Sequence, residues 1–255
     1  MTAPLKVWLE ADGRLLRLRL SRPKANLVDR AMAAAIDSAL AEHLDEPKLT
    51  AVLIDAEGPH FSYGASIQEH RPAEVAAMLA EFHRLVLRMV ASPVIILVAA
   101  HGHCLGGGLE LAAAGHLLFV APDANLGQPE IQLGVFAPTA SCLLPELIGP
   151  ARAFDLLISG RSISGSEAVA IGLAKEAAPN PEGAALNFFN EQLTSKSASS
   201  LRHASKAARF DLAARIRSKL AEVERLYLEE LMASRDPIEG IEAFLAKRPP
   251  KWENR

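Results

Sequence analysis

Two glutamates in otherwise apolar segments are the side chains of this sequence best suited to acid–base chemistry. Glu110 lies within GGLELAAA, and Glu130 lies within GQPEIQLG. The intervening residues span one helix–strand unit, which can return both carboxylates to the same end of a layer. Two carboxylates that face one cavity push one pKa up, which leaves an acid beside a base. The alternatives are that Glu110 only complements a helix N-terminus and that Glu130 is an exposed loop acid, as most glutamates are.

A glycine cluster precedes the first of these glutamates and predicts a site for an anion or an oxyanion. Gly106, Gly107 and Gly108 follow an apolar strand and open a helix, where free N–H groups and the helix dipole favour negative charge. The cluster is neither a P-loop nor a dinucleotide fingerprint. Tight packing between helix and strand is an equally good explanation. In the loop HFSYGASIQEH, the N–H of Ala65 would complete a two-donor oxyanion hole with that of Gly107.

The elements that must position these residues alternate between strands and helices. An antiparallel hairpin is predicted on both sides of Asp12-Gly13, and a helix capped by Asp29 is followed by the strand AVLIDA. The cycle repeats with a helix over about 72–90, a strand over 93–100, a helix over 107–114 and a strand over 116–121. Ser164 is predicted to cap a further helix, and beyond Pro181 the chain is predicted to be helical. This order predicts a layered α/β fold with right-handed crossovers.

Length and composition exclude several classes of protein. The 255 residues suggest one large domain or one domain with a small appendage, and 30 acidic against 27 basic residues create no global field for nucleic acid. The two cysteines, Cys104 and Cys142, lie in apolar surroundings and favour a reducing cytoplasm. The longest apolar run, Val94 to Ala100, is too short to cross a membrane, and the N-terminus lacks a signal peptide. His101 and His103 have no third ligand in view, so no metal site is predicted.

Four segments in order and spacing resemble the crotonase family of enoyl-CoA hydratases and isomerases over essentially the whole chain: FSYGASI, HGHCLGGGLELAAAG, LGQPEIQLG and AFLAKRPP. The resemblance implies an α/β fold, a crotonase-like spiral of ββα units with a C-terminal helical oligomerisation section. Residues 1–190 would form the core with the acyl-CoA site, and residues 191–255 the trimerisation section of a homotrimer or a dimer of trimers. An apolar stripe in this section is a candidate oligomer contact: Leu212, Ile216, Leu220, Val223, Tyr227 and Leu231.

The resemblance also assigns residues to roles. Ala65 and Gly107 would hold the thioester carbonyl of an acyl-CoA, Glu110 would chiefly activate water, and Glu130 would chiefly deliver a proton. No metal or other cofactor is implied, since coenzyme A is part of the substrate. The positions expected to bind the substrate are Lys24, Ala25, Ser66, Ile67, Val135, Phe136, Pro138, Phe244 and Lys247, the last two acting on the CoA of an adjacent subunit.

Two departures from the family pattern bear on the substrate. Ser66 stands where most members have aspartate, and Pro138 stands where hydratases use a glycine N–H to hold the nucleophilic water. Proline has no N–H to donate. With these changes the sequence most resembles the dienoyl-CoA hydratases of anaerobic benzoyl-CoA degradation. We therefore expect hydration of cyclohexa-1,5-diene-1-carbonyl-CoA to 6-hydroxycyclohex-1-ene-1-carbonyl-CoA.

Other functions of the same fold remain open at this point. A general enoyl-CoA hydratase, an isomerase or a thioester hydrolase is the nearest alternative, although an isomerase commonly needs only one carboxylate. Some crotonase-like proteins bind RNA through a lysine-rich helix, but the segment from Asp29 to Leu44 has no lysine. A non-catalytic scaffold would turn over no acyl-CoA. We expect neither nucleic acid nor a membrane among the partners.

Overall fold

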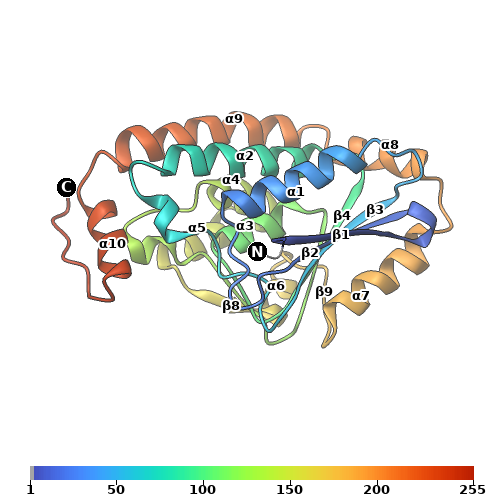
Figure 1. The fold of residues 1–255 in the computed structure, drawn as a ribbon, viewed down its shortest axis with the longest axis horizontal. Coiled ribbons are helices and arrows are strands. Elements are labelled where there is room, and N and C mark those ends of the chain that lie inside the picture. Colours follow the sequence, from blue (N-terminus) through green and yellow to red (C-terminus); the bar gives the residue numbers. More distant parts are fainter. Residues whose placement is uncertain (1–2) are drawn as a thin grey trace.

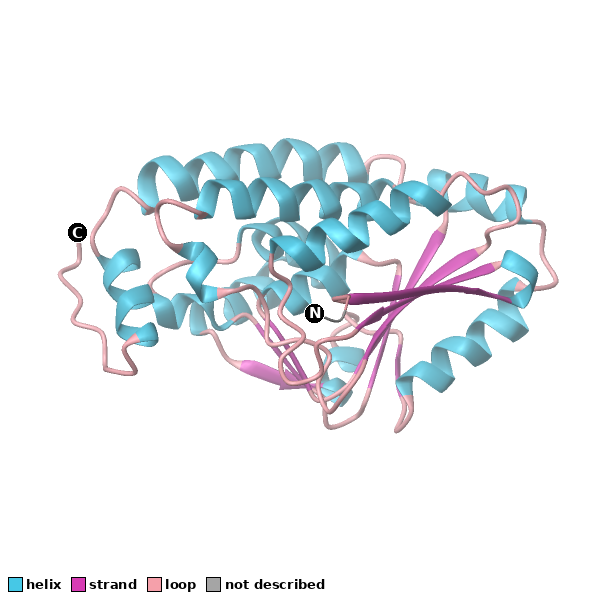
Figure 2. Cartoon of the chain, in the orientation of Figure 1, coloured by secondary structure: helices cyan, strands magenta, loops and turns pink. Residues whose placement is uncertain are grey.

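Two β-sheets surrounded by helices make up the computed structural model, which describes residues 3–255 (Figures 1 and 2). The larger sheet has six strands, and all neighbours are parallel except β1 and β2. Its order is β1 (Leu5–Glu10), β2 (Leu15–Leu20), β3 (Ala51–Ala56), β4 (Ile95–Ala100), β6 (Leu117–Val120) and β9 (Glu176–Ala177). The smaller sheet has the order β5 (His103–Leu105), β7 (Asn125–Gly127) and β8 (Ser162–Ser164).

Helices cover both faces of the larger sheet. The helices of the described residues are α1 (Arg30–His43), α2 (Val75–Ala91), α3 (Gly107–Ala114), α4 (Pro138–Ile148), α5 (Pro150–Ser159), α6 (Gly165–Ala170), α7 (Pro181–Phe188), α8 (Ala198–Ala208), α9 (Leu212–Arg225) and α10 (Asp236–Leu245). In Figure 1, α1, α2 and α9 lie on one side of the sheet and α7 lies on the other. Short 3₁₀ or π segments are η1 (Ala11–Gly13), η2 (Ile67–His70), η3 (Pro129–Leu133), η4 (Phe189–Leu193) and η5 (Leu226–Leu231). Among residues 3–255, no helix has the length and apolar character to span a bilayer.

Alternate residues of the central strands enter two separate hydrophobic clusters. Val52 and Ile96 pack into the cluster that includes residues of α1, α2 and α9, whereas Leu53 and Leu97 pack against Phe189 of η4. Successive side chains of a strand point to opposite faces, so a strand covered on both sides must be apolar throughout. The apolar runs AVLIDA and IILVAA are therefore interior parallel strands.

Most predicted elements are present, with their expected caps. The Asp29 side chain accepts a hydrogen bond from the Met32 N–H at 2.9 Å, and the Ser164 hydroxyl accepts one from the Glu167 N–H at 3.1 Å. Helix α2 begins at Val75, slightly later than predicted. The sequence analysis missed the smaller sheet, because strands of three residues show no measurable alternation.

The apolar stripe of α9 and η5 packs inside its own chain, which corrects its interpretation as an oligomer contact. Ile216 and Leu220 are fully buried in the main core, where α9 contacts α2 and α4. Tyr227 is buried in a second cluster with Val75 and Ile241. The periodicity predicted an apolar face correctly, but a face buried on α2 and α4 is not free for another subunit. The boundary predicted after residue 190 falls within η4, and the division into two sections stays a prediction.

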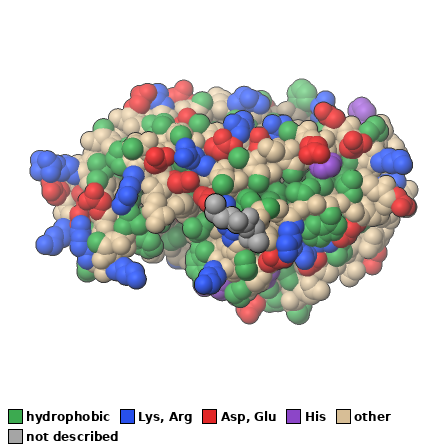
Figure 3. Space-filling view, viewed as in Figure 1, with side chains coloured by type: hydrophobic (Ala, Val, Ile, Leu, Met, Phe, Trp, Pro, Cys, Tyr) green, Lys and Arg blue, Asp and Glu red, His purple; other side chains and the backbone are tan. Residues whose placement is uncertain are grey.

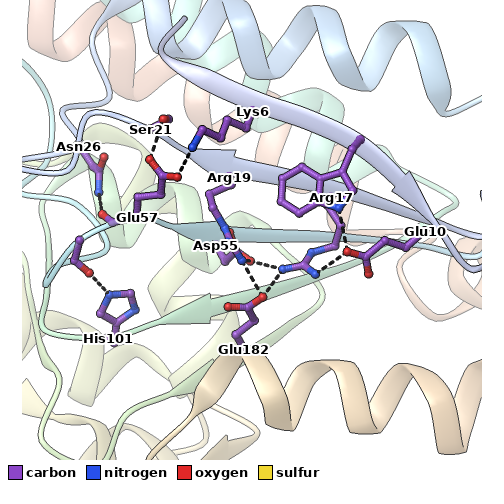
Figure 4. Close-up of polar contacts among 12 residues, drawn as sticks. Lys6, Glu10, Arg17, Arg19, Ser21, Asn26, Asp55, Glu57, His101 and Glu182 are labelled. Atoms are coloured by element: carbon purple, nitrogen blue, oxygen red, sulfur yellow. Dashed lines mark hydrogen bonds and ion pairs between the residues drawn. The ribbon is translucent and has the colours of Figure 1, made fainter. Parts of the chain in front are cut away.

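A buried ion cluster links strands β2 and β3 of the larger sheet to α7 (Figure 4). Arg17 of β2 and Asp55 of β3 are each 3% exposed and form an ion pair, and Arg19 binds Asp55 at 2.6 Å. Glu182 of α7 receives both guanidinium groups, from Arg17 at 2.5 Å and from Arg19 at 2.6 Å. Buried charges are tolerated only when they are paired. These charges therefore hold the framework together at a distance from the glutamates in α3 and η3.

Candidate active site

A narrow cavity of about 70 Å³ lies where the loop before η2, the start of α3, η3 and the start of α4 meet α2 and η5. Eight residues that were predicted to act in catalysis or substrate binding line it: Ala65, Ile67, Gly107, Glu110, Glu130, Val135, Phe136 and Pro138. Other lining side chains had no predicted role in the site: Tyr63, His70, Met78, Leu79, Phe82, Leu133 and Tyr227, the last predicted only as part of the apolar stripe. The cavity combines apolar walls with a few polar groups, as small-molecule sites commonly do.

The glycine cluster lets three segments meet at van der Waals distance. A Cβ at Gly106 would lie 2.5 Å from Oε1 of Glu130, and one at Gly108 would lie 2.7 Å from Cβ of Ser62. A Cβ at Gly107 would lie 3.1 Å from the backbone nitrogen of Ala65. The tight packing that the sequence offered as one explanation is confirmed. Gly106 and Gly107 also line the cavity, and the anion site stays a prediction.

Two backbone N–H groups, those of Ala65 and Gly107, lie side by side at this cavity. Gly64, which precedes Ala65, adopts a φ of +100°. Two hydrogen bonds hold it: the Gly64 carbonyl accepts one from the Val28 N–H, and the Gly64 N–H donates one to Ser62 Oγ. Gly107 is the first residue of α3, so its N–H has no acceptor within the helix. Among residues 3–255, neither N–H donates a hydrogen bond. Two adjacent N–H groups without acceptors are what an oxyanion hole needs, and this role of the pair stays a prediction.

Glu110 points from the first turn of α3 to the N-terminus of α4. Its side chain is buried, and Oε1 accepts a hydrogen bond from the Ala140 N–H at 2.8 Å. Burial raises the pKa of Glu110 above its ordinary value, while the N–H groups of Ala140 and Thr139 and the charge of His83 oppose the rise. The helix terminus thus stabilises the carboxylate form where burial alone would favour the protonated form.

Glu130 follows Pro129 in η3 and faces Glu110 across the cavity. Burial, together with the negative charge of Glu110, raises the pKa of Glu130 to about 8. The side-chain amide of the buried Gln128 lies beside both carboxyl oxygens of Glu130. The sequence analysis did not select Gln128, although its position two residues before Glu130 was a usable signal. At neutral pH this site therefore favours a proton on Glu130.

Pro138 is the first residue of α4 and lines the cavity. Because the next two N–H groups of α4 face Glu110, this helix end has no N–H left for a water molecule. Phe136 lies beside Pro138 and contacts the ring of Tyr227 edge-to-face at 5.1 Å between centroids. The structure thus places residue 138 at the cavity, and its effect on the choice of substrate stays a prediction.

His70 also contacts the cavity and is hydrogen-bonded through Nδ1 to the Ser66 carbonyl at 2.9 Å. Burial lowers the pKa of His70, so its neutral form carries the proton on Nδ1 and leaves Nε2 as an acceptor. The only signal in the sequence was the unusual segment IQEHRP. The Ser66 hydroxyl itself binds Gln68 at 3.3 Å and does not line the cavity.

Four other predicted residues lie outside the cavity of their own chain. The Ala25 carbonyl accepts a hydrogen bond from the Tyr63 N–H at 2.9 Å, which places Ala25 and the exposed Lys24 beside the Gly64 loop. Asn26 fixes this segment by donating to the carbonyls of Glu57 and His60, and Figure 4 shows the contact with Glu57. Phe244 at the end of α10 is 54% exposed, and Lys247 follows it.

No group of three or more histidine, cysteine, aspartate and glutamate residues within 3–255 is arranged to hold a metal ion. The cysteines Cys104 and Cys142 are both buried and unpaired, as predicted. The chemistry available at the cavity is therefore that of two carboxyl groups, backbone N–H donors and neutral polar side chains.

Comparison with known proteins identifies close relatives of the whole chain. Residues 10–255 match the family model "Enoyl-CoA hydratase/isomerase". The chain is 64% identical over 254 residues to cyclohexa-1,5-dienecarbonyl-CoA hydratase of Thauera aromatica, covering 100% of this chain and 98% of that protein. Among solved structures, carnitinyl-CoA hydratase from Mycobacterium avium superimposes with a TM-score of 0.88 at 28% identity, covering 100% of both chains. An enoyl-CoA hydratase from Mycobacterium avium subsp. paratuberculosis has a TM-score of 0.86 at 24% identity, again over both whole chains.

The raised pKa of Glu130 predicts a pH-dependent cost to stability. Because the folded chain holds this proton to about pH 8 and an unfolded glutamate loses it near pH 4.5, the free energy of unfolding falls as pH rises through this window. Glu130→Gln removes the contribution of Glu130 to this dependence. The variant should gain stability relative to the unmodified chain by about 1 kcal/mol or more between pH 5 and pH 8 in urea unfolding. Glu42→Gln, at an exposed position of α1, is the control, and an equal pH trend in both variants would contradict the prediction.

Proposed function

The chain belongs to the enoyl-CoA hydratase/isomerase family, and we propose that it hydrates cyclohexa-1,5-diene-1-carbonyl-CoA to 6-hydroxycyclohex-1-ene-1-carbonyl-CoA. It is a hydro-lyase that acts on a CoA thioester. One observation carries the proposal: Glu110 and Glu130 face a single cavity beside the free N–H groups of Ala65 and Gly107. Two carboxyl groups provide the base and the acid that water addition requires, whereas a double-bond isomerase commonly needs one.

The thioester oxygen accepts hydrogen bonds from the N–H groups of Ala65 and Gly107. Negative charge grows on this oxygen as water attacks the ring, and the N-terminus of α3 favours that charge. Removing one donor of this kind typically costs about 2.7–4 kcal/mol of transition-state stabilisation. The close approach at Gly107 supports this role, since any side chain there would press on the Ala65 amide.

Proton transfer in this mechanism is divided between the two glutamates. Glu110 accepts a proton from water as the oxygen bonds to ring carbon 2, and the electrons move to the thioester oxygen as a dienolate. Glu130 donates its proton to ring carbon 5, and the remaining double bond then joins carbons 1 and 6. The N–H groups of α4 suit Glu110 to the carboxylate form, and the raised pKa suits Glu130 to the acid form. The ring gains one hydroxyl and one hydrogen, so the reaction needs no redox cofactor.

The remaining predicted contacts fit a ring-shaped acyl group and a nucleotide outside the cavity. Ile67, Val135 and Phe136 supply apolar walls. Lys24 and Ala25 adjoin the Gly64 loop, where the CoA chain would leave, and Ser66 shapes this loop through its carbonyl contact with His70. We also propose a cytoplasmic location, because two buried free cysteines suit a reducing compartment.

We propose a homo-oligomer, a trimer or a dimer of trimers, on the basis of the family resemblance. Large apolar side chains that their own chain leaves uncovered support this: Phe154 is 66% exposed, Ile158 55% and Phe244 54%. Phe244 and Lys247 would then contact the CoA of an adjacent subunit. No nucleic acid is expected, and basic and acidic side chains alternate over much of the face in Figure 3.

The assembly is tested by sedimentation velocity of the full chain. A particle three or six times the chain mass is expected at micromolar concentration, and Phe244→Asp should shift it toward smaller species because a charge would enter the apolar contact. A monomer at this concentration would contradict the proposal. Leu9→Asp is a useful control, since Leu9 is 47% exposed on β1, outside the section predicted to trimerise.

The two carboxyl groups are tested by Glu110→Gln and Glu130→Gln. Each substitution should lower kcat by about 10²-fold or more, with a smaller effect on acyl-CoA affinity, because each removes a proton-transfer step. The double variant should be little worse than the poorer single one. Glu42→Gln controls for the loss of a surface charge, and near-normal turnover in either active-site variant would remove that residue from the mechanism.

Substrate choice follows from Pro138 and the ring-sized apolar walls. We expect kcat/KM for the cyclic dienoyl-CoA to exceed that for crotonyl-CoA by about 10²-fold or more, because a small misplacement of water or acid has this effect on rate. In heavy water, deuterium should enter the ring at the far end of the diene. Equal efficiency with crotonyl-CoA, or deuterium next to the thioester, would identify a general enoyl-CoA hydratase instead.

A further inference from the structure

Tyr227 carries a buried hydroxyl that the mechanism above does not use. The side chain comes from the π segment η5, is 1% exposed and lines the cavity with Glu110 and Glu130. Among residues 3–255, its hydroxyl has no hydrogen-bond partner. A buried hydroxyl without a partner costs free energy, so its retention in an otherwise apolar stripe needs an explanation.

Other buried polar atoms without partners do not share this position. Thr139 Oγ1 and His83 Nε2 are also buried without partners, but neither residue lines the cavity. Tyr63 lines the cavity but is 42% exposed, so water can satisfy its hydroxyl. Tyr227 is therefore the lining side chain that combines a buried O–H donor with the absence of a partner.

The start of α4 offers no donor to the water molecule that must be added. Pro138 has no N–H, and the next N–H groups of α4 face Glu110. The N–H groups of Ala65 and Gly107 lie at the thioester end of the cavity. Glu110 as a carboxylate can only accept a hydrogen bond from water. A second group that donates a hydrogen bond to the water oxygen would fix the orientation of the water for attack.

We propose that Tyr227 is this donor: its O–H holds the oxygen that is water in the substrate complex and the ring hydroxyl in the product. The inference rests on the proposed hydration. Burial raises the pKa of Tyr227, so the phenol keeps its proton throughout the working pH range. The edge-to-face contact with Phe136 fixes the ring in the cavity wall.

Binding of matched ligands to Tyr227→Phe tests this role. In a Glu130→Gln background, which suppresses turnover, calorimetry compares 6-hydroxycyclohex-1-ene-1-carbonyl-CoA with cyclohex-1-ene-1-carbonyl-CoA, which lacks only the hydroxyl. Tyr227→Phe should weaken binding of the hydroxylated ligand by about tenfold and leave the other within about twofold. Equal effects on the two ligands, or no effect on either, would overturn the proposal.

Turnover and stability separate this role from simple packing. In the otherwise unmodified chain, Tyr227→Phe should lower kcat for hydration by about tenfold or more while KM for the diene changes little. The midpoint of urea unfolding should stay equal or rise, because an unpaired buried hydroxyl is removed. An unchanged kcat would overturn the proposal.

A spectroscopic experiment needs no substitution at residue 227. The chain has two tyrosines, so 3-fluorotyrosine gives two ¹⁹F signals that Tyr63→Phe assigns. The Tyr227 signal should respond more strongly to the hydroxylated ligand than to its deoxy partner, and equal responses would contradict the proposal. If crotonyl-CoA proves to be the substrate, 3-hydroxybutyryl-CoA and butyryl-CoA replace the cyclic pair, so failure of the substrate assignment is distinguished from failure of the Tyr227 role.

Discussion

The close approach of two backbone segments, Gly106–Gly108 and Ser62–Ala65, is the constraint on which the site depends. Only residues without a Cβ allow these segments to come so near, since added atoms would lie 2.5–3.1 Å from their neighbours. The contact sets the direction of α3 and hence of Glu110, places Glu130 against the turn, and brings two N–H groups together. A single larger residue at these glycines would displace both the N–H donors and the two carboxyl groups, because all of them pack against the same turn.

Placing two carboxyl groups in one buried cavity carries an energetic cost that other parts of the fold offset. Burial raises the pKa of Glu110 and that of Glu130, and the nearby negative charge of Glu110 raises the pKa of Glu130 further. The N-terminus of α4 stabilises negative charge on Glu110, and Gln128 holds Glu130 in place. Proline at the start of α4 costs the helix nothing, since a first-turn N–H has no intrahelical acceptor. Pro138 nevertheless removes a hydrogen-bond donor from the cavity. A side chain must therefore supply the hydrogen bond that an N–H at residue 138 would have donated to water.

The C-terminal helices complete the site as well as the fold. Helix α9 packs on α2 and α4, and η5 continues it so that Tyr227 reaches the cavity. Helix α10 lies against η3, where Gly240 approaches the Leu133 carbonyl too closely for any side chain. The loop that bears Glu130 is thus held by segments more than a hundred residues later in the chain. A substitution in these helices would therefore displace Glu130 even though the substituted residue does not contact it.

The sequence by itself determined the order of the larger elements, the caps at Asp29 and Ser164, the apolar faces and the candidates Glu110, Glu130, Ala65 and Gly107. These are local properties, because helix periodicity, capping and glycine turns depend on residues close together in the chain. Ordered motifs extended this to the family and to the absence of an N–H at Pro138. The strands of the smaller sheet could not be detected in the sequence, because three residues are too few to show an alternating pattern.

Only the tertiary structure decided which distant side chains meet in the cavity. The stripe on α9 and η5 carried an apolar period, but a period cannot say whether a face packs on its own chain or on a copy. For the same reason the sequence placed Tyr227 in the apolar stripe, although it lines the cavity together with the two glutamates. Gln128, His70 and the N-terminus of α4 gained their significance from contacts across the fold. Hydrogen bonds and pKa shifts depend on distance in space, which sequence spacing does not specify.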